Sequence, residues 1–499
     1  MNTNRLVTWI TFLAIFAMAA RASMDTDTWW HLRAGEWIVQ NQGVPHFDPF
    51  SYTKAGEPWE YPGWLVEVPM YFLYQILGPG GLNLWTALMV MLTFMFVWLT
   101  ISGGVFLKGF VIILAAAVSG VYWAARPYLV TFLFTALFLW ILEEYRWNRS
   151  YQNSPLTLAT GSNPRYLTNI HLWWLPILMV IWVNSHGGFA IGFILLGIYI
   201  LDQLVHEIPN ISKFKIQNLK FARLLFIGFL MILAVCVNPY GTEMLGYPFK
   251  TMSIGALQEF IQEWQSPNFH LRSAQPFIWL WIFTFAAVGI SRRRLALTDF
   301  LLVASFSYMS LLAWRNVALF ALVSPVVLTR HAEPVVAALR QKFGNILSSN
   351  ISPSRRLNLL NWILLVVLAL AVAVKTGIDF PQSANQRVFR ETLPVDAVAF
   401  IKAESPAGRL FNSYNWGGYL LWELPEYPVF IDGRTDLYDG EIIDQWLQVV
   451  RAEEGWQQVL DRWKIHLVLV EPATPVISLL KQNGWKLLFQ DERSVVYGR

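Results

Sequence analysis

Residues 6–32 read LVTWITFLAIFAMAARASMDTDTWWHL, an apolar run followed at once by acidic and aromatic residues. The apolar part, 6–23, comes close to the roughly 20 residues that a helix needs to cross a bilayer. The polar part places Asp25, Asp27 and His31 just beyond the end of that predicted span. We therefore expect a membrane protein whose chemistry gathers next to its first span.

The composition of the whole chain agrees with this expectation. Of its 499 residues, 55% are hydrophobic and only 14% are charged, whereas soluble domains carry about 25% charged residues. Its 25 tryptophans are typical of aromatic belts at the two membrane surfaces, and stacking on sugar rings is the alternative interpretation. A single cysteine, Cys236, excludes an intramolecular disulfide and a cysteine-based metal site.

Apolar runs recur along most of the chain and predict a mainly α-helical, polytopic transmembrane bundle. About eleven spans are expected, at 6–23, 83–101, 109–125, 128–143, 171–184, 187–206, 222–238, 276–290, 297–313, 317–329 and 359–375. The run 171–184 is short enough for a re-entrant hairpin. The run 65–77 is shorter still, and it is interpreted as a juxtamembrane helix at the interface.

Charge divides the chain into two predicted domains. Residues 1–376 hold 25 Lys/Arg and 16 Asp/Glu, whereas residues 377–499 hold 12 and 17. This shift predicts a transmembrane domain over 1–376, with a first extracytoplasmic loop at 24–64, and a soluble domain over 377–499. Strand-like runs at 408–412, 428–432, 465–470, 486–489 and 494–497 alternate with helical patterns, which favours a C-terminal α/β domain.

The basic residues of the loops predict the orientation of the bundle. With the N-terminus in the cytoplasm, 17 basic residues of the membrane domain fall on the cytoplasmic side and eight on the other. The positive-inside rule then predicts a cytoplasmic N-terminus and an extracytoplasmic C-terminal domain. The expected location is the inner (plasma) membrane, which the chain would cross several times. Residues 1–22 could alternatively be a signal peptide, because Ala20-Arg21-Ala22 resembles a cleavage site. The orientation of the other spans would not change.

This topology brings five polar segments to the outer face. They are the loop 24–64, Arg126-Pro127, the turn 184–188, the loop 238–275 and the segment 314–316. Each has a simpler explanation as a solvated helix end, a tight turn or an interfacial arginine. Their convergence favours a site for an anionic headgroup.

The residue types on this face suggest a chemistry. A carboxylate of Asp25 or Asp27 could act as a general base, or the pair could bind a divalent cation such as Mg²⁺ or Mn²⁺. The guanidinium groups of Arg126 and Arg315 suit phosphate oxygens. No nucleotide-binding glycine loop and no HExxH motif occur, so a lipid-phosphate donor fits better than ATP, and no nucleic-acid partner is expected. Further candidate substrate-binding residues are His31, Glu60, Asn184 and His186.

The motif Asp25-Thr-Asp27-Thr-Trp-Trp-His31 resembles the acidic motif after the first span of the GT-C superfamily of membrane glycosyltransferases. The segment Pro58-Trp59-Glu60-Tyr61-Pro62 is similar to a later acidic motif of the aminoarabinose transferases in that superfamily. The chain as a whole resembles bacterial membrane proteins that share several of its segments. These segments are VNSHGGF (183–189), VNPYG (237–241), EWQSP (263–267), WRN (314–316), NSYNWGGYLLWELP (412–425) and VFIDGRTDLY (429–438).

The resemblance implies an inverting transfer of a sugar from a polyprenyl-phosphate carrier to an extracytoplasmic acceptor. It implies that Asp25 is the general base and Asp27 a second acid or metal ligand, while Arg126 and Arg315 would contact the donor phosphate. The chain departs from the Asp-Glu motif of the protein mannosyltransferases and lacks the WWDYG signature of oligosaccharyltransferases. The subfamily, the sugar and the acceptor stay open.

Two other functions remain compatible with the sequence. A glycolipid transporter or flippase would use the same membrane bundle, although no internal repeat is evident. A non-catalytic envelope assembly protein would use the C-terminal domain to bind a partner. In that domain, the turn Asp432-Gly433-Arg434-Thr435-Asp436 is either a ligand site or an internal Arg–Asp pair that holds a loop.

Overall fold

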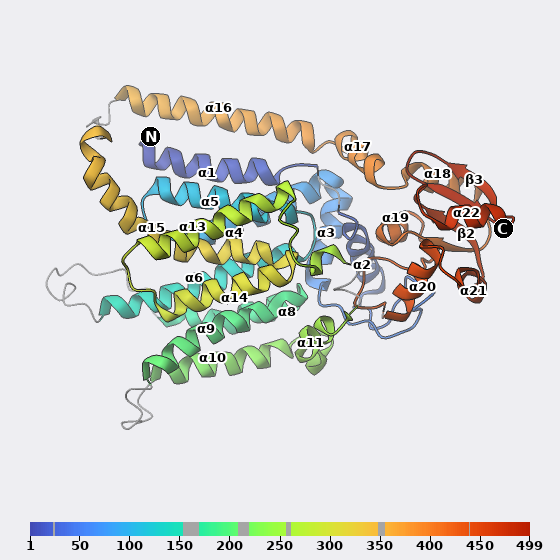
Figure 1. Cartoon of the computed structure of the whole chain (residues 1–499), viewed down its shortest axis with the longest axis horizontal. Helices are drawn as coiled ribbons and strands as arrows, with labels where there is room; N and C mark the ends of the chain where they lie inside the picture. Colours follow the sequence, from blue (N-terminus) through green and yellow to red (C-terminus); the bar gives the residue numbers. More distant parts are fainter. Residues whose placement is uncertain (23–24, 153–168, 208–218, 256–260, 348–354, 439) are drawn as a thin grey trace.

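The structure is a computed structural model that describes residues 1–22, 25–152, 169–207, 219–255, 261–347, 355–438 and 440–499. Figure 1 shows the apolar helices side by side along one direction, with the C-terminal residues at one end of the bundle. We call residues 382–499 the tail and this end of the bundle the tail end.

All eleven predicted apolar runs form helices. They are α1 (Thr3–Ala19), α4 (Pro79–Thr100), α5 (Val105–Ser119), α6 (Tyr128–Gln152), α8 (Trp174–Val183), α9 (Ala190–Glu207), α10 (Leu219–Val235), α13 (Gln275–Ile290), α14 (Leu297–Leu312), α15 (Val317–Leu347) and α16 (Arg355–Asp379). Among the described residues, seven helical stretches are long and apolar enough to cross a membrane. The predicted spans in α1, α8, α10 and α14 form shorter apolar helices. The expected mainly helical, multi-pass architecture is therefore confirmed.

Short elements at the tail end connect these helices and shape the site. The first loop contains a helix of its own, α2 (Thr28–Asn41), whose residues Trp29, Trp30 and Leu32 are buried. The predicted juxtamembrane segment forms α3 (Trp64–Leu77). The other short elements at this end are η1 (Gly120–Tyr122), η3 (Gly187–Phe189), η5 (Gly241–Leu245), α11 (Tyr247–Met252), η6 (Gln262–Trp264), η7 (Arg272–Ala274) and η8 (Trp314–Asn316). A further short element, η2 (Asn169–Trp173), leads into the other end of α8, where His171 lies beside Trp140 of α6.

The tail is a small α/β unit, as its alternating pattern predicts. Its elements are α17 (Gln382–Thr392), α18 (Val395–Glu404), β1 (Arg409–Asn412), η9 (Tyr414–Trp416), α19 (Gly417–Glu423), α20 (Gly440–Val450), α21 (Trp456–Arg462), β2 (Ile465–Val470), α22 (Val476–Gln482), β3 (Lys486–Gln490) and β4 (Val495–Gly498). The sheet order is β1-β2-β4-β3, with β1 and β2 parallel and the other pairs antiparallel.

One predicted strand is wrong. The segment 428–432 does not join the tail sheet; instead, Val429 forms an isolated bridge with Ser51 of the first loop. The backbone N–H of Phe430 is taken by the side chain of Asn412, at 2.9 Å. The apolar pattern of this segment therefore reflects burial between the tail and the first loop.

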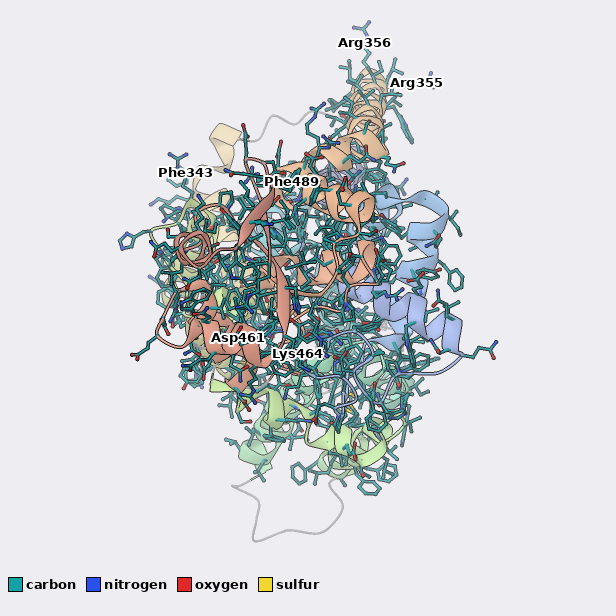
Figure 2. The ribbon with its side chains drawn as sticks, turned by 90° about the vertical axis from the view of Figure 1, so that its right-hand side faces the viewer. Phe343, Arg355, Arg356, Asp461, Lys464 and Phe489 are labelled. Atoms are coloured by element: carbon teal, nitrogen blue, oxygen red, sulfur yellow. The ribbon has the colours of Figure 1, made fainter. Side chains whose placement is uncertain are left out.

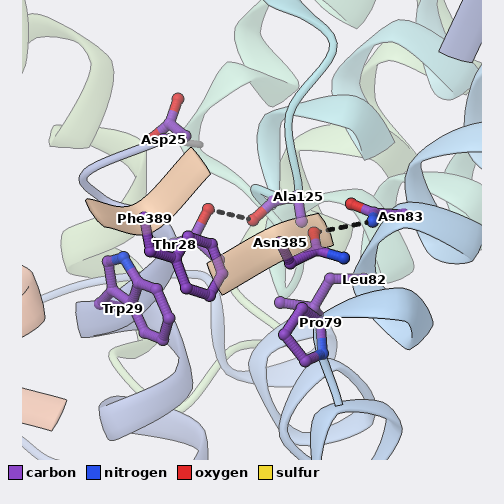
Figure 3. A pocket seen from close by; sticks show the side chains of 9 residues that line it. All are labelled: Asp25, Thr28, Trp29, Pro79, Leu82, Asn83, Ala125, Asn385 and Phe389. Atoms are coloured by element: carbon purple, nitrogen blue, oxygen red, sulfur yellow. Dashed lines mark hydrogen bonds between the residues drawn. The ribbon is translucent and has the colours of Figure 1, made fainter. Parts of the chain in front are cut away.

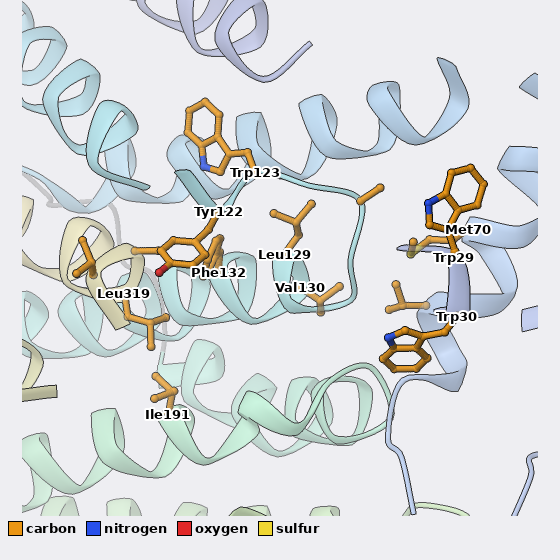
Figure 4. Close-up of a cluster of buried hydrophobic side chains, with 14 of the residues drawn as sticks. Trp29, Trp30, Met70, Tyr122, Trp123, Leu129, Val130, Phe132, Ile191 and Leu319 are labelled. Atoms are coloured by element: carbon orange, nitrogen blue, oxygen red, sulfur yellow. The ribbon is translucent and has the colours of Figure 1, made fainter. Parts of the chain in front are cut away.

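The tail and the bundle share one continuous hydrophobic core. Figure 4 shows Trp29 and Trp30 of α2 beside Met70, facing the loop that leads to Leu129 and Val130 of α6. Figure 2 looks from the tail end, with the tail in front of the bundle and Arg355 of α16 at its periphery. α16 packs mainly on α1, and Asn361 is the one buried residue described in it.

A buried charge network ties four helices together at the opposite end of the bundle. The guanidinium of Arg330 in α15 contacts Asp299 of α14 and lies 2.5 Å from Glu143 of α6. The hydroxyl of Tyr199 in α9 donates to Glu143 at 2.6 Å, and Arg146 lies 2.7 Å from Asp299. Glu143 is 15 residues beyond the start of α6, so the network lies on the order of 20 Å from the tail end.

Candidate functional site

Three carboxylates converge on one arginine at the tail end. Arg126 lies in the turn between η1 and α6, with Nη2 at 2.8 Å from an oxygen of Asp27. Its Nη1 lies 3.4 Å from Asp25 and 3.2 Å from Glu263 of η6. We call these four residues the acid–arginine cluster. It brings together three of the residues predicted from sequence and adds Glu263.

Local hydrogen bonds explain how the short acidic motif reaches Arg126. Asp25 precedes α2, and its carboxylate accepts the backbone N–H of Asp27 at 2.9 Å. The hydroxyl of Thr28 donates to the carbonyl of Ala125 at 3.1 Å, which fixes the start of α2 against the turn that carries Arg126. The guanidinium of Arg126 also lies 5.1 Å from the centre of the Tyr128 ring.

The electrostatics of the cluster differ from one member to the next. Burial is the main reason why the pKa of Asp27 is raised to about 7. The charge of Arg126 lowers this pKa in part, and the charges of Asp25, Glu263 and Asp432 raise it further. Burial would also raise the pKa of Glu263, but the charges of Arg126 and Arg315 outweigh it and lower that pKa. Burial disfavours the charge of Arg126, but the surrounding carboxylates hold its pKa well above the usual value. Arg126 is therefore a fixed cation, whereas Asp27 can gain or lose a proton near neutral pH.

The tail contributes directly to this region through the turn 432–436. A Cβ atom built on Gly433 would lie 1.8 Å from Oδ1 of Asp27, so only glycine lets the turn lie this close. Buried Arg434 pairs with Asp432 of the tail at 2.7 Å and with Asp48 of the first loop at 2.6 Å. The internal Arg–Asp pair expected here is therefore present, and it also fastens the tail to the first loop.

A cavity opens beside the cluster and has Asp25 in its wall. The cavity is small and partly open to its surroundings, and among its lining residues Asp25 is the charged one. Figure 3 shows Asp25 on one side, Trp29 and Phe389 on another, and Asn83 hydrogen-bonded to Asn385 at 3.0 Å. The cavity lies at the start of α4 and beside α17, where helices of the bundle begin or end.

Arg315 and His186 flank the cluster, and they differ in charge. The guanidinium of Arg315 lies 4.5 Å from the centre of the Trp264 ring, and it has no ion pair within the described part of the chain. Burial, followed by the charges of Arg315 and Arg126, lowers the pKa of His186 to about 3. His186 accepts the N–H of Gly188 at its Nδ1 and is neutral, so Arg315 is the available cation.

The other predicted site residues make contacts outside the acid–arginine cluster. His31 is buried with Nδ1 2.9 Å from Glu67, and Asn184 uses its amide to bond Trp64, Val180 and Val237. Glu60 lies 3.6 Å from Lys250 and lines a second, small cavity together with Asp436. Binding roles for these residues remain predictions.

Sequence reasoning missed the importance of Glu263 and Gly433 for different reasons. Glu263 belongs to the segment EWQSP, which was noticed but gives no indication that it folds back onto Arg126. Gly433 lies in the noticed turn 432–436, but its contact with Asp27 spans most of the chain. Within the described residues, no group of three or more His, Cys, Asp or Glu side chains is placed to hold a metal ion.

The fold of the chain is similar to that of a membrane-embedded oligosaccharyltransferase of known structure. Similar solved structures are those of the archaeal oligosaccharyltransferase AglB from Archaeoglobus fulgidus. The structure with an inhibitory peptide and a dolichol-phosphate matches 94% of this chain and 70% of its own, with 13% identity and a TM-score of 0.57. The structure with a tethered acceptor peptide matches 93% and 69%, with 14% identity and a TM-score of 0.55. No protein-family model and no curated protein sequence matches the chain.

Proposed function

We propose that the protein is a membrane glycosyltransferase that moves a sugar from a polyprenyl-phosphate carrier to an acceptor hydroxyl on the extracytoplasmic side. The observation that carries the proposal is the cavity at the end of the bundle, with Asp25 in its wall and the acid–arginine cluster behind it. The similar fold of an oligosaccharyltransferase bound to dolichol-phosphate supports a donor of this chemical class.

Asp25 is the proposed general base because it reaches the cavity. In the transfer step, its carboxylate takes the proton of the acceptor hydroxyl while the hydroxyl oxygen attacks the anomeric carbon of the donor. The bond from that carbon to the phosphate oxygen breaks on the opposite face, so the configuration inverts. The polyprenyl phosphate leaves with the electron pair.

Arg315 is the proposed contact for the departing phosphate. Negative charge develops on the phosphate oxygen as the bond breaks, and a fixed cation stabilises such charge. Arg315 makes no direct ion pair among the described residues, although its charge acts on Glu263, whereas Arg126 pairs with three carboxylates. In this proposal, Arg126 and Asp27 orient Asp25 and set the charge around it.

The proposal is tested by replacing the acids in membranes that contain the protein. Membranes are supplied with a panel of polyprenyl-phosphate hexoses labelled in the sugar, and release of label from the carrier is followed. We expect Asp25→Asn to abolish release and Arg315→Gln to lower it by about 100-fold, as for other residues that stabilise developing charge. The exposed variant Glu453→Gln is the matched control.

The same membranes distinguish the alternative functions. A flippase would move the labelled lipid across the bilayer without releasing its sugar, and it would do so equally well with Asn at position 25. An assembly protein would show neither movement nor release. Sugar release that is unchanged in both Asp25→Asn and Asp27→Asn would refute the proposal.

A further inference from the structure

The acid–arginine cluster resembles a cation-binding site in which the cation is a side chain, Arg126, and not a bound ion. Three carboxylates from two separate segments, two before α2 and one in η6, point at one centre, and that centre is the guanidinium of Arg126. Divalent cations such as Mg²⁺ and Mn²⁺ are held by carboxylate oxygens that converge in this way. The oxygens expected from sequence to be metal ligands are instead engaged by nitrogen atoms of Arg126.

Arg126 is also anchored where it lies. Its backbone N–H donates to Ala124 at 2.8 Å, its guanidinium packs on the Tyr128 ring, and the neighbouring carbonyl of Ala125 is held by Thr28. A metal ion bound by Asp25 and Asp27 would lie within a few ångströms of this guanidinium, where repulsion between the two cations is strong. The residues present therefore do not fit a divalent cation while Arg126 stays in place.

We infer that Arg126 is a built-in substitute for a divalent cation: it orients Asp25 and Asp27 and balances their charge, and the site binds no metal. This assignment concerns the cluster of the proposed transferase, but its test reads metal binding and does not depend on sugar transfer. Arg126 acts through the carboxylates and is thus a positioning residue.

The test is titration of the purified full-length protein with Mn²⁺, in which the resonance signal of free Mn²⁺ reports what is bound. The wild-type protein should bind no Mn²⁺ at the cluster, and its unfolding temperature should not change with Mn²⁺ or with a chelator. Arg126→Gln should bind Mn²⁺ at least about tenfold more tightly, because it removes a positive charge from among three carboxylates. Adding Asp25→Asn to that variant should abolish the gain.

Two matched variants separate this effect from a general change in charge. Arg126→Lys keeps a cation in the cluster and should bind no Mn²⁺. Arg33→Gln removes an arginine that pairs with Glu36 elsewhere in the first loop, and it should behave like the wild type.

Two results would overturn the inference. One is Mn²⁺ binding by the wild-type protein that Asp25→Asn removes, a measurement that does not require Arg126→Gln to fold. The other is an Arg126→Gln variant that folds and gains no Mn²⁺ site.

Discussion

Asp25 and Asp27 are two residues apart but have different surroundings. Asp25 lines the cavity, whereas Asp27 lies under Gly433 of the tail. The sequence motif predicted that both acids belong to one site with Arg126, because the orientation of the spans brings their loops to the same face. The residue types alone did not separate their roles, which came only from the family resemblance, since what distinguishes their surroundings is a turn more than 400 residues further along the chain.

The raised pKa of Asp27 predicts a pH dependence of stability. In the folded chain the pKa is about 7, against 3.8 for an ordinary aspartate, so the folded state keeps a proton that the unfolded state loses. The free energy of unfolding of the wild type should therefore fall between about pH 4 and pH 7, relative to Asp27→Asn, which has no such proton. Unfolding temperatures of both proteins at pH 5, 6, 7 and 8 test this. A constant difference between them would contradict it.

Gly433 predicts a steric effect at the same contact. Gly433→Ala forces the turn 432–436 away from Asp27 and should lower the free energy of unfolding by about 1–3 kcal/mol, as overpacking does. Thermal unfolding in detergent measures the loss. Gly440→Ala is the matched control, because a Cβ there meets no atom within 4 Å. Equal effects of the two substitutions would show that the contact with Asp27 is unimportant.

At the scale of elements, the positions of the helices could be predicted from the sequence, but the elements against which they pack could not. Runs of apolar residues predict helices in a membrane because an unpaired backbone is costly there, and all eleven such runs are helical. The segment 428–432 was predicted to be a strand of the tail sheet, but it lies between the tail and the first loop. An apolar pattern indicates that a segment is buried, but it does not indicate which element covers it. The charge network of Arg330, Glu143 and Asp299 likewise depends on how α6, α14 and α15 pack.

This network predicts a large stability effect far from the site. Arg330→Ala leaves the buried carboxylates of Glu143 and Asp299 without that cation, and it should cost about 3–5 kcal/mol in the free energy of unfolding. The exposed Arg294→Ala, on the same end of the bundle, should change it by less than about 0.5 kcal/mol. Thermal unfolding of both variants in detergent is the measurement, and similar losses would contradict the role of the network.

At the scale of the whole molecule, the tail completes the site and is not an appendage. The pair Arg434–Asp48 and the shared core join it to the first loop, so both should lie on the same side of the membrane. The domain boundary near residue 376 remains a prediction, and α16 continues past it to Asp379.

The loop charges predict which side this is. In a Cys236→Ser background, a cysteine at exposed Glu404 of the tail should react with a membrane-impermeant maleimide in intact cells. A cysteine at exposed Lys342, beyond the opposite end of the bundle, should react only after the cells are permeabilised. The reverse pattern of labelling would invert the proposed orientation.

The ion pair between Arg434 and Asp48 can form only after nearly the whole chain has been synthesised. The two residues are 386 positions apart, and ribosomes add about 5–20 residues per second. The turn that covers Asp48 and the acids beside it is therefore synthesised roughly 20–80 seconds after they are. During that interval a nascent chain carries an open, negatively charged loop, and a ribosome that stalls before residue 432 leaves a chain with all its predicted spans but no finished site.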